Sequence, residues 1–174
     1  MVGMRVIKSA AALLSVLVPT ASMTDLFVYG TLKRGQPNYF RMTDAGNGRA
    51  EYLGTARTVE RLPLVIAGKY NIPFLLNVPG TGQRVRGEVY RVDAPMLAFL
   101  DKFESCPAMY QRTPVRLEVE EWAGEGGPSP GSLVEAFVYS TTTYQPEWLA
   151  LPTHESYDHA GDHGLSYVSR EYRD

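Results

Sequence analysis

The stretch that decides the fold runs from residue 26 to residue 35 and reads Leu-Phe-Val-Tyr-Gly-Thr-Leu-Lys-Arg-Gly. Its first four residues are apolar, aromatic or β-branched, a composition typical of a buried strand. Gly30 ends the run, so the strand is expected to deliver a turn, and the N–H groups of this turn, with the hydroxyl of Thr31, are candidates for binding an anion. The alternative is a plain turn, because the stretch lacks the spacing of a Walker or dinucleotide-binding loop.

Further strands are expected along the chain, because similar apolar runs recur between Gly, Pro or polar turn residues. Residues 115–119 alternate in the way that half-buried strands do. The predicted strands cover residues 55–59, 62–67, 84–92, 113–121 and 133–140. The sequence therefore predicts an α+β fold, a mixed β-rich sheet or small barrel.

A helix is expected between Asp93 and Phe103. Asp93 is a good N-cap, Pro95 falls in the first turn, and apolar residues recur at helical spacing. This helix should pack across the sheet. A weaker helix is expected over residues 39–44, a mobile Gly/Pro-rich loop over 123–131, and a polar, irregular tail after Pro152.

The size and charge of the chain limit its function. Its 174 residues match one domain, and 44% hydrophobic against 21% charged residues excludes a disordered chain. A net charge of −2 gives no basic surface for nucleic acid or for anionic lipid. A small molecule or a protein is the expected partner, and we expect no nucleic-acid or membrane partner.

The first 23 residues differ from the rest of the chain. Arg5 and Lys8 precede an apolar stretch, and the first acidic residue is Asp25. This pattern is typical of a targeting peptide, secretory or mitochondrial, while the alternative is an extension ahead of a second start at Met23. We therefore divide the chain into a leader or extension, residues 1–23, and a domain, residues 24–174. No apolar run reaches the length of a membrane span.

Glu104 is the first candidate for chemistry. It follows the apolar face of the predicted helix, so both the helix dipole and the apolar surroundings should raise the pKa of its carboxyl group. A general acid/base needs a shift in that direction. The alternative is an ordinary solvated glutamate at a helix end.

Other reactive residues have simpler explanations. Cys106 is the single cysteine, which favours a reducing compartment, and as a nucleophile it would need a base from the histidines of the tail. A buried apolar role is the alternative for it. The tail has enough histidine and acidic residues to bind a metal but no recognised spacing, so no metal site is expected. Tyr110, Arg112 and Tyr139 line a pocket or simply pack beside the strands.

Several segments together closely resemble one family. They are residues 26–38, Pro63 to Gly68, Asn71-Ile72-Pro73, and Phe103-Glu104-Ser105-Cys106-Pro107-Ala108-Met109-Tyr110-Gln111-Arg112, with further matches at 137–140, 146–148 and 156–158. They are similar to the gamma-glutamylcyclotransferase-like, or AIG2-like, family, and within it to the branch that acts on gamma-glutamyl amines. The resemblance covers almost everything after Met23.

The resemblance implies a small mixed β-barrel with a few helices and a ligand cavity at the barrel mouth. It implies that Glu104 is the catalytic acid/base. It also implies that the glutamyl group is held by the turn after the first strand. The residues expected to bind substrate are Tyr29, Gly30, Thr31, Leu32, Asn71, Ile72, Tyr110, Arg112 and Tyr139.

The implied reaction converts epsilon-(gamma-glutamyl)-lysine, left from transglutaminase cross-links, into 5-oxoproline and lysine. The α-amine of the substrate attacks its own γ-carbonyl carbon, so no protein nucleophile, metal or cofactor is expected. The alternatives are a cyclotransferase for other gamma-glutamyl amino acids or peptides, a ligand-binding barrel without catalysis, and a hydrolase that uses Cys106. We expect a cytoplasmic monomer, although the leader is also compatible with secretion or an organelle.

Overall fold

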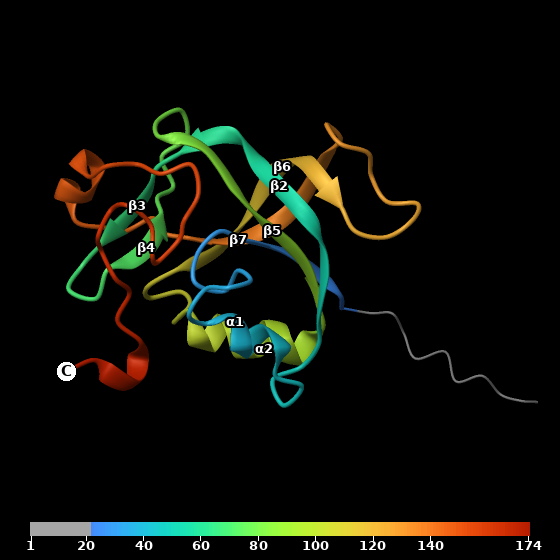
Figure 1. The fold of residues 1–174 in the computed structure, drawn as a ribbon, viewed down its shortest axis with the longest axis horizontal. Helices are drawn as coiled ribbons and strands as arrows, with labels where there is room; N and C mark the ends of the chain where they lie inside the picture. The colour runs from blue at the N-terminus through green and yellow to red at the C-terminus, as the bar shows by residue number, and fades with distance from the viewer. Residues whose placement is uncertain (1–21) are drawn as a thin grey trace, which may run out of the picture.

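The computed structural model describes residues 22–174, so the predicted leader lies almost wholly outside the described part of the chain. The elements are β1 (Thr24–Val28), α1 (Tyr39–Thr43), β2 (Ala50–Leu62), β3 (Leu64–Ala67), β4 (Ile72–Leu75), β5 (Gln83–Val92), α2 (Ala94–Phe103), β6 (Gln111–Trp122), β7 (Leu133–Ser140) and the 3-10 helices η1 (Pro146–Ala150) and η2 (Arg170–Tyr172). The described residues form a closed barrel with α1, α2 and η2 at one end, which confirms the predicted α+β barrel (Figure 1).

The barrel is closed by pairing of its first and last strands. The strand order is β1-β5-β2-β6-β7, and β1 then pairs with β7. This last pairing is parallel, whereas the other barrel pairings are antiparallel. β3 and β4 form a separate antiparallel pair. The sheet is therefore mixed, as predicted, and the residues that follow β1 emerge beside β7.

β1 is buried on both faces because it lies between two apolar clusters. Leu26 and Val28 belong to the cluster that contains α2, while Phe27 and Tyr29 belong to the cluster inside the barrel. This alternation follows from the two-residue period of a strand. A Cβ on Gly87 of β5 would lie 2.7 Å from the Phe27 ring, so a glycine is needed there.

α2 begins and packs as the sequence predicts. The Asp93 carboxylate caps the helix by accepting a hydrogen bond from the N–H of Met96 at 3.0 Å, and it also accepts one from Arg49 at 3.0 Å. Met96 and Leu100 are fully buried against β1 and β5. Burial of this one face fixes where the C-terminal end of α2 lies relative to the barrel.

The strand predictions differ from the structure in three places. The strand predicted at 55–59 is the middle of the longer β2, which runs from Ala50 to Leu62. The run predicted at 62–67 is two elements, because Pro63 separates the end of β2 from β3. β4 is absent from the prediction because Pro73 interrupts a short apolar run, and proline argues against a strand interior. The predicted loop at 123–131 is largely exposed between β6 and β7, and its mobility stays a prediction.

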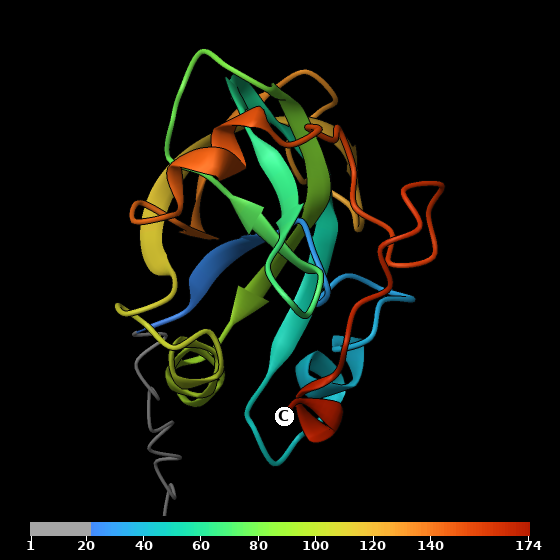
Figure 2. The same ribbon diagram turned by 90° about the vertical axis from the view of Figure 1, so that its left-hand side faces the viewer.

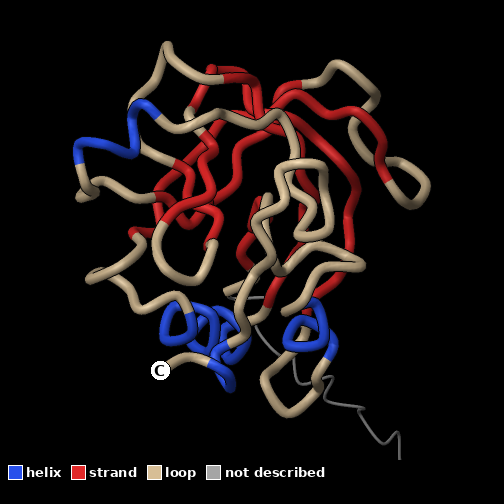
Figure 3. The backbone as a smooth tube through the Cα atoms, turned by 60° about the vertical axis from the view of Figure 1, so that its left-hand side comes forward, coloured by secondary structure: helices blue, strands red, loops and turns tan. Residues whose placement is uncertain are grey.

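The tail is largely irregular, as predicted, but it packs on the domain. In Figure 2 it runs along the barrel and ends beside α1, and Figure 3 shows η2 among the helices at that end. Tyr157 is 1% exposed in the barrel cluster. Within residues 22–174, no helix is long and apolar enough to cross a membrane.

Candidate active site

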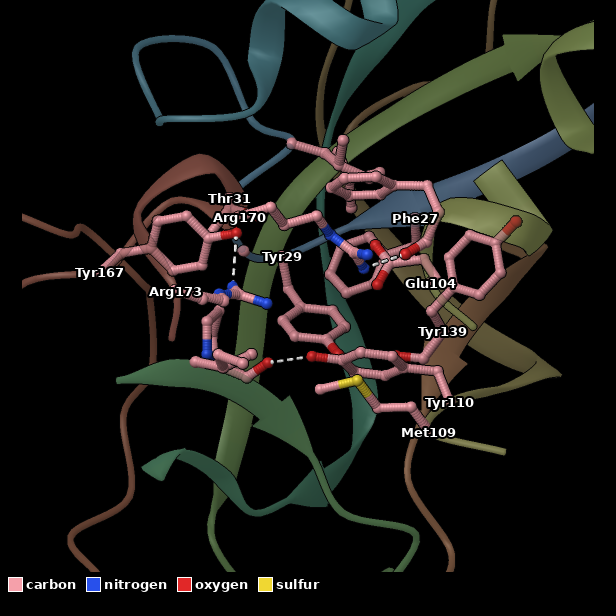
Figure 4. Close-up of a pocket in the computed structure, with 16 residues that line it drawn as sticks. Phe27, Tyr29, Thr31, Glu104, Met109, Tyr110, Tyr139, Tyr167, Arg170 and Arg173 are labelled. Carbon is pink, nitrogen blue, oxygen red and sulfur yellow. Dashed lines mark hydrogen bonds between the residues drawn. The ribbon is translucent and has the colours of Figure 1, made fainter. Parts of the chain in front are cut away.

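A pocket opens where β1, α2, β4, β7 and the tail meet (Figure 4). It combines several aromatic side chains with one carboxylate and two guanidinium groups. The residues that line it are Phe27, Val28, Tyr29, Gly30, Thr31, Leu32, Ile72, Pro73, Phe103, Glu104, Met109, Tyr110, Tyr139, Tyr167, Arg170 and Arg173.

Glu104 enters the pocket from the C-terminal end of α2. Its N–H donates to Leu100 at 2.8 Å, and the chain then reverses through Ser105, whose φ is +53°. Cys106 N–H donates to Asp101 O at 2.9 Å and Ser105 N–H donates to Lys102 O at 3.1 Å. These two bonds form a Schellman motif with serine in the left-handed position that glycine usually occupies. The motif fixes the backbone that carries Glu104.

The carboxyl group of Glu104 titrates near neutrality. Burial raises its pKa from 4.5 to about 7, and the nearby Arg170 guanidinium opposes that rise. A carboxyl group with this pKa exists in both protonation states at neutral pH, which general acid/base catalysis requires. The direction of the shift agrees with the prediction, and burial in the pocket is its largest cause.

The loop after β1 forms the part of the pocket that the sequence predicts for the glutamyl group. Two hydrogen bonds from Asn38 fix this loop. The backbone N–H of Asn38 donates to Thr31 O at 2.9 Å, and its side-chain amide donates to Thr31 Oγ1 at 3.0 Å. None of the hydrogen bonds between described residues uses the N–H of Thr31 or Leu32 as donor. These donors remain open to an anionic group of a ligand.

Three tyrosines of the pocket are fixed by hydrogen bonds. Tyr29 Oη donates to Tyr139 O at 2.6 Å, and Tyr110 Oη donates to Pro73 O at 2.9 Å. Tyr139 Oη donates to the Asp101 carboxylate at 2.7 Å. Burial raises the pKa of all three phenols, so they stay neutral. These three side chains form rigid walls of the pocket, and each of their hydroxyl groups already donates its hydrogen bond to the protein.

Eight of the ten residues that the sequence assigns to the site line this pocket, and Asn71 and Arg112 do not. The Asn71 amide donates to Ser166 O at 2.8 Å and so ties the tail to the β3–β4 turn. Arg112 forms a bidentate ion pair with Asp101 at 3.0 and 3.2 Å. Both support residues of the pocket, and direct contact with substrate stays a prediction for them.

Cys106 and the histidines do not form a catalytic pair. Burial raises the pKa of the Cys106 thiol to about 11, which keeps it protonated at neutral pH. His163 instead lies 2.6 Å from Asp158 O, through Nε2, and accepts from Leu165 N–H at 2.9 Å through Nδ1. In the part of the chain that the structure describes, no three His, Cys, Asp or Glu residues are grouped as metal ligands.

Comparison with known proteins identifies the family. The family model described as gamma-glutamyl cyclotransferase, AIG2-like, matches residues 26–159. The chain belongs to this AIG2-like family. It is 58% identical over 151 residues to the gamma-glutamylaminecyclotransferase of Rattus norvegicus, covering 87% of this chain and 100% of that protein. The gamma-glutamylaminecyclotransferase of Homo sapiens is 54% identical over 153 residues, covering 87% and 100%.

Solved structures agree with the AIG2-like assignment. The crystal structure of an AIG2-like protein from Mus musculus has a TM-score of 0.81 and 56% sequence identity, and the match covers 87% of this chain and 99% of that chain. A structure named gamma-glutamyl cyclotransferase has a TM-score of 0.51 at 19% identity, covering 73% and 74%, and shows the fold alone. Both carry the barrel on which this pocket is built.

The sequence analysis misses the tail residues of the pocket. Tyr167, Arg170 and Arg173 line it, although the family model ends at residue 159. Arg170 donates to Phe103 O and lies over the Phe103 ring, 4.5 Å from its centroid. No periodic apolar pattern marks this segment, so its place could not be predicted. The only sequence signal is the presence of two arginines in a tail otherwise rich in aromatic and polar residues.

Proposed function

We propose that the chain is a gamma-glutamylamine cyclotransferase that converts epsilon-(gamma-L-glutamyl)-L-lysine into 5-oxo-L-proline and L-lysine. Relatives that are identical to it at more than half of the aligned positions bear the name of that activity. The observation that carries the proposal is the presence of Glu104, with a pKa near 7, in one pocket with the loop after β1. Such an enzyme contributes to the breakdown of transglutaminase cross-links.

The reaction needs no group beyond the substrate and this pocket. The α-amine nitrogen attacks the γ-carbonyl carbon, the new C–N bond closes a five-membered ring, and the bond to the lysine Nε breaks. Because nucleophile and electrophile belong to one molecule, holding the glutamyl chain in a bent conformation supplies much of the rate enhancement. The rigid tyrosine walls and the loop at Tyr29–Leu32 are placed to impose that conformation.

Glu104 carries the proton between the two nitrogens. In its ionised form it accepts a proton from the α-ammonium group, which frees the nucleophile. In its protonated form it donates that proton to the lysine Nε as this nitrogen leaves. The regenerated carboxylate then takes the second proton that the ring nitrogen loses and passes it to the freed amine, so lysine departs with its side-chain nitrogen as an ammonium group. A pKa near neutrality suits both steps, and Arg170 keeps part of the carboxyl population ionised before substrate binds.

The N–H groups of Thr31 and Leu32 are the candidate donors to the negative charges of the substrate. They suit either the glutamyl α-carboxylate or the oxyanion of the tetrahedral intermediate. Asn38 holds this loop through hydrogen bonds to both the backbone and the side chain of Thr31. Preorganised donors of this kind stabilise the transition state because they need not rearrange during the reaction.

The test is incubation of the full chain with epsilon-(gamma-glutamyl)-lysine, followed by mass spectrometry of the products. Wild-type protein should release 5-oxoproline and lysine in equal amounts. Glu104→Gln should lose roughly 10²- to 10⁴-fold in kcat, the usual contribution of a general acid/base. Glu147→Gln, which changes an exposed carboxylate on η1, is the matched control and should keep full activity.

Two results would contradict the proposal in different ways. Release of glutamate in place of 5-oxoproline would show hydrolysis. A Glu104→Gln variant with near wild-type turnover would remove Glu104 from the mechanism. The monomeric state, the lack of a nucleic-acid partner and the cytoplasmic location stay predictions.

A further inference from the structure

Arg173 presents an unpaired positive group to the pocket. Its Nε donates to Val168 O at 3.0 Å and its Nη2 donates to Tyr167 Oη at 3.0 Å. Neither partner is a carboxylate, and among the described residues no ion pair involves Arg173. Its charge helps to lower the pKa of the Glu171 carboxyl group, but that carboxylate is paired with Arg41 at 3.1 Å. A guanidinium group has further N–H donors in the same plane. Its charge and these donors are available to an anionic ligand.

The guanidinium group of Arg173 packs against two aromatic rings. Its guanidinium carbon lies 5.0 Å from the centroid of the Tyr70 ring and 5.3 Å from that of Tyr167. The Tyr167 hydroxyl is held in turn by the amide of Asn38 at 2.9 Å. Arg173 is half-buried and so is less accessible to solvent than Arg170, which is exposed. A planar cation that is held by aromatic rings and by two hydrogen bonds is preorganised for bidentate recognition of a carboxylate.

Arg173 and Glu104 enter the pocket from different elements. In Figure 4, Arg173 lies with Tyr167 on the tail side, whereas Glu104 lies near Phe27 and Tyr139 on the barrel side. The family model covers Glu104 and the loop after β1 but ends at residue 159, before Tyr167 and Arg173. The glutamyl group is common to all substrates of the proposed reaction, and the amine is the part that varies. The tail is therefore suited to bind the amine.

We propose that Arg173 binds the carboxylate of the leaving amine and so makes the enzyme selective for amines that carry one. This inference rests on the proposed function. It defines the preferred substrates as gamma-glutamyl derivatives of amino acids linked through a side-chain amine, rather than of simple alkylamines. Arg173 contacts a part of the substrate that does not react, so it acts on binding and not on the chemical step.

The test compares two substrates that differ by one group. Gamma-glutamylcadaverine is epsilon-(gamma-glutamyl)-lysine with hydrogen in place of the lysine carboxylate. The full-length protein and its Arg173→Gln variant are assayed with both, and KM and kcat are measured separately. A charge-assisted hydrogen bond supports an expected rise in KM of about 10- to 100-fold for the lysine derivative in Arg173→Gln, with little change in kcat. For the cadaverine derivative the rise should be about threefold or less.

Two further variants make the comparison specific. Arg170→Gln removes the same charge from the same tail and should affect both substrates by the same factor, because Arg170 lies beside Glu104. Arg116→Gln changes an exposed arginine on β6, outside the pocket, and should leave both activities unchanged.

The outcomes are distinguishable. An Arg173→Gln variant that loses the same factor on both substrates would overturn the inference and would place Arg173 at the glutamyl group or in a structural role. An Arg173→Gln variant that loses nothing on either substrate would overturn it as well. Wild-type protein that releases 5-oxoproline from neither substrate would instead overturn the proposed function, and the inference with it.

Discussion

One wall of the pocket comes from the barrel and α2, and the other comes from the tail, and the two walls are held in different ways. The barrel wall rests on fully buried residues such as Leu26 and Leu100. The tail wall rests on hydrogen bonds such as Val168 N–H to Tyr70 O, at 3.0 Å, and on the Arg41–Glu171 ion pair at 3.1 Å. Apolar burial therefore places the catalytic carboxylate, while polar contacts place the two arginines.

This difference explains what the sequence could predict. Glu104 was found because the helix before it has a capping residue and a regular apolar face, and such patterns can be read locally. The turn after β1 was found because a glycine ends a buried run. Tyr167 and Arg173 were missed because hydrogen bonds between residues 129 positions apart, such as Asn38 to Tyr167, leave no local pattern.

The resemblance to a known family added the roles of these residues but not the tail. It assigned Glu104 as the acid/base, and local electrostatics had already marked that residue. The sequence also assigns Asn71 and Arg112 to the substrate, and the structure gives them hydrogen bonds to Ser166 and Asp101. These hydrogen bonds support residues around the pocket, and contact of Asn71 and Arg112 with substrate stays a prediction.

The largest expected effect is on the barrel wall. Leu100→Ala removes a fully buried side chain of α2 and should lower the free energy of unfolding by about 2 to 5 kcal/mol. Urea unfolding followed by circular dichroism measures this change. Leu149→Ala, at a side chain 51% exposed on η1, is the control and should stay within roughly 0.5 kcal/mol of wild type. Equal losses for the two variants would contradict the account of the core.

Removal of residues 165–174 should lower activity more than stability, the reverse of what we expect for the core variant Leu100→Ala. The variant loses Arg170 and Arg173 from the pocket but no fully buried side chain. We expect kcat/KM for epsilon-(gamma-glutamyl)-lysine to fall about 100-fold, as expected for lost charge-assisted hydrogen bonds, with a smaller loss of stability than in Leu100→Ala. Tyr172→Ala, at a side chain 79% exposed in the same tail, should keep full activity. A fully active truncated enzyme would show that the tail takes no part in the reaction.

The smallest expected effect is a shift in pH dependence. Arg170 lowers the pKa of Glu104, so Arg170→Gln should raise that pKa further above its usual value. Because the ionised carboxylate accepts the first proton, the acidic limb of kcat/KM against pH should move to higher pH. The profile is compared with that of Arg116→Gln, a charge-matched variant at a residue that does not line the pocket. A limb that stays in place, or moves to lower pH, would separate Arg170 from Glu104.

The most direct test is a titration of Glu104 itself. Carbon-13 NMR of the side-chain carboxyl groups, with the Glu104 signal assigned by its absence from Glu104→Gln, follows protonation at that one site. The expected midpoint is about 7, because burial in the pocket disfavours the ionised form. A midpoint near the ordinary value of 4.5 would mean that the carboxyl group is solvated, and it would contradict the assignment of Glu104 as the residue that carries the proton.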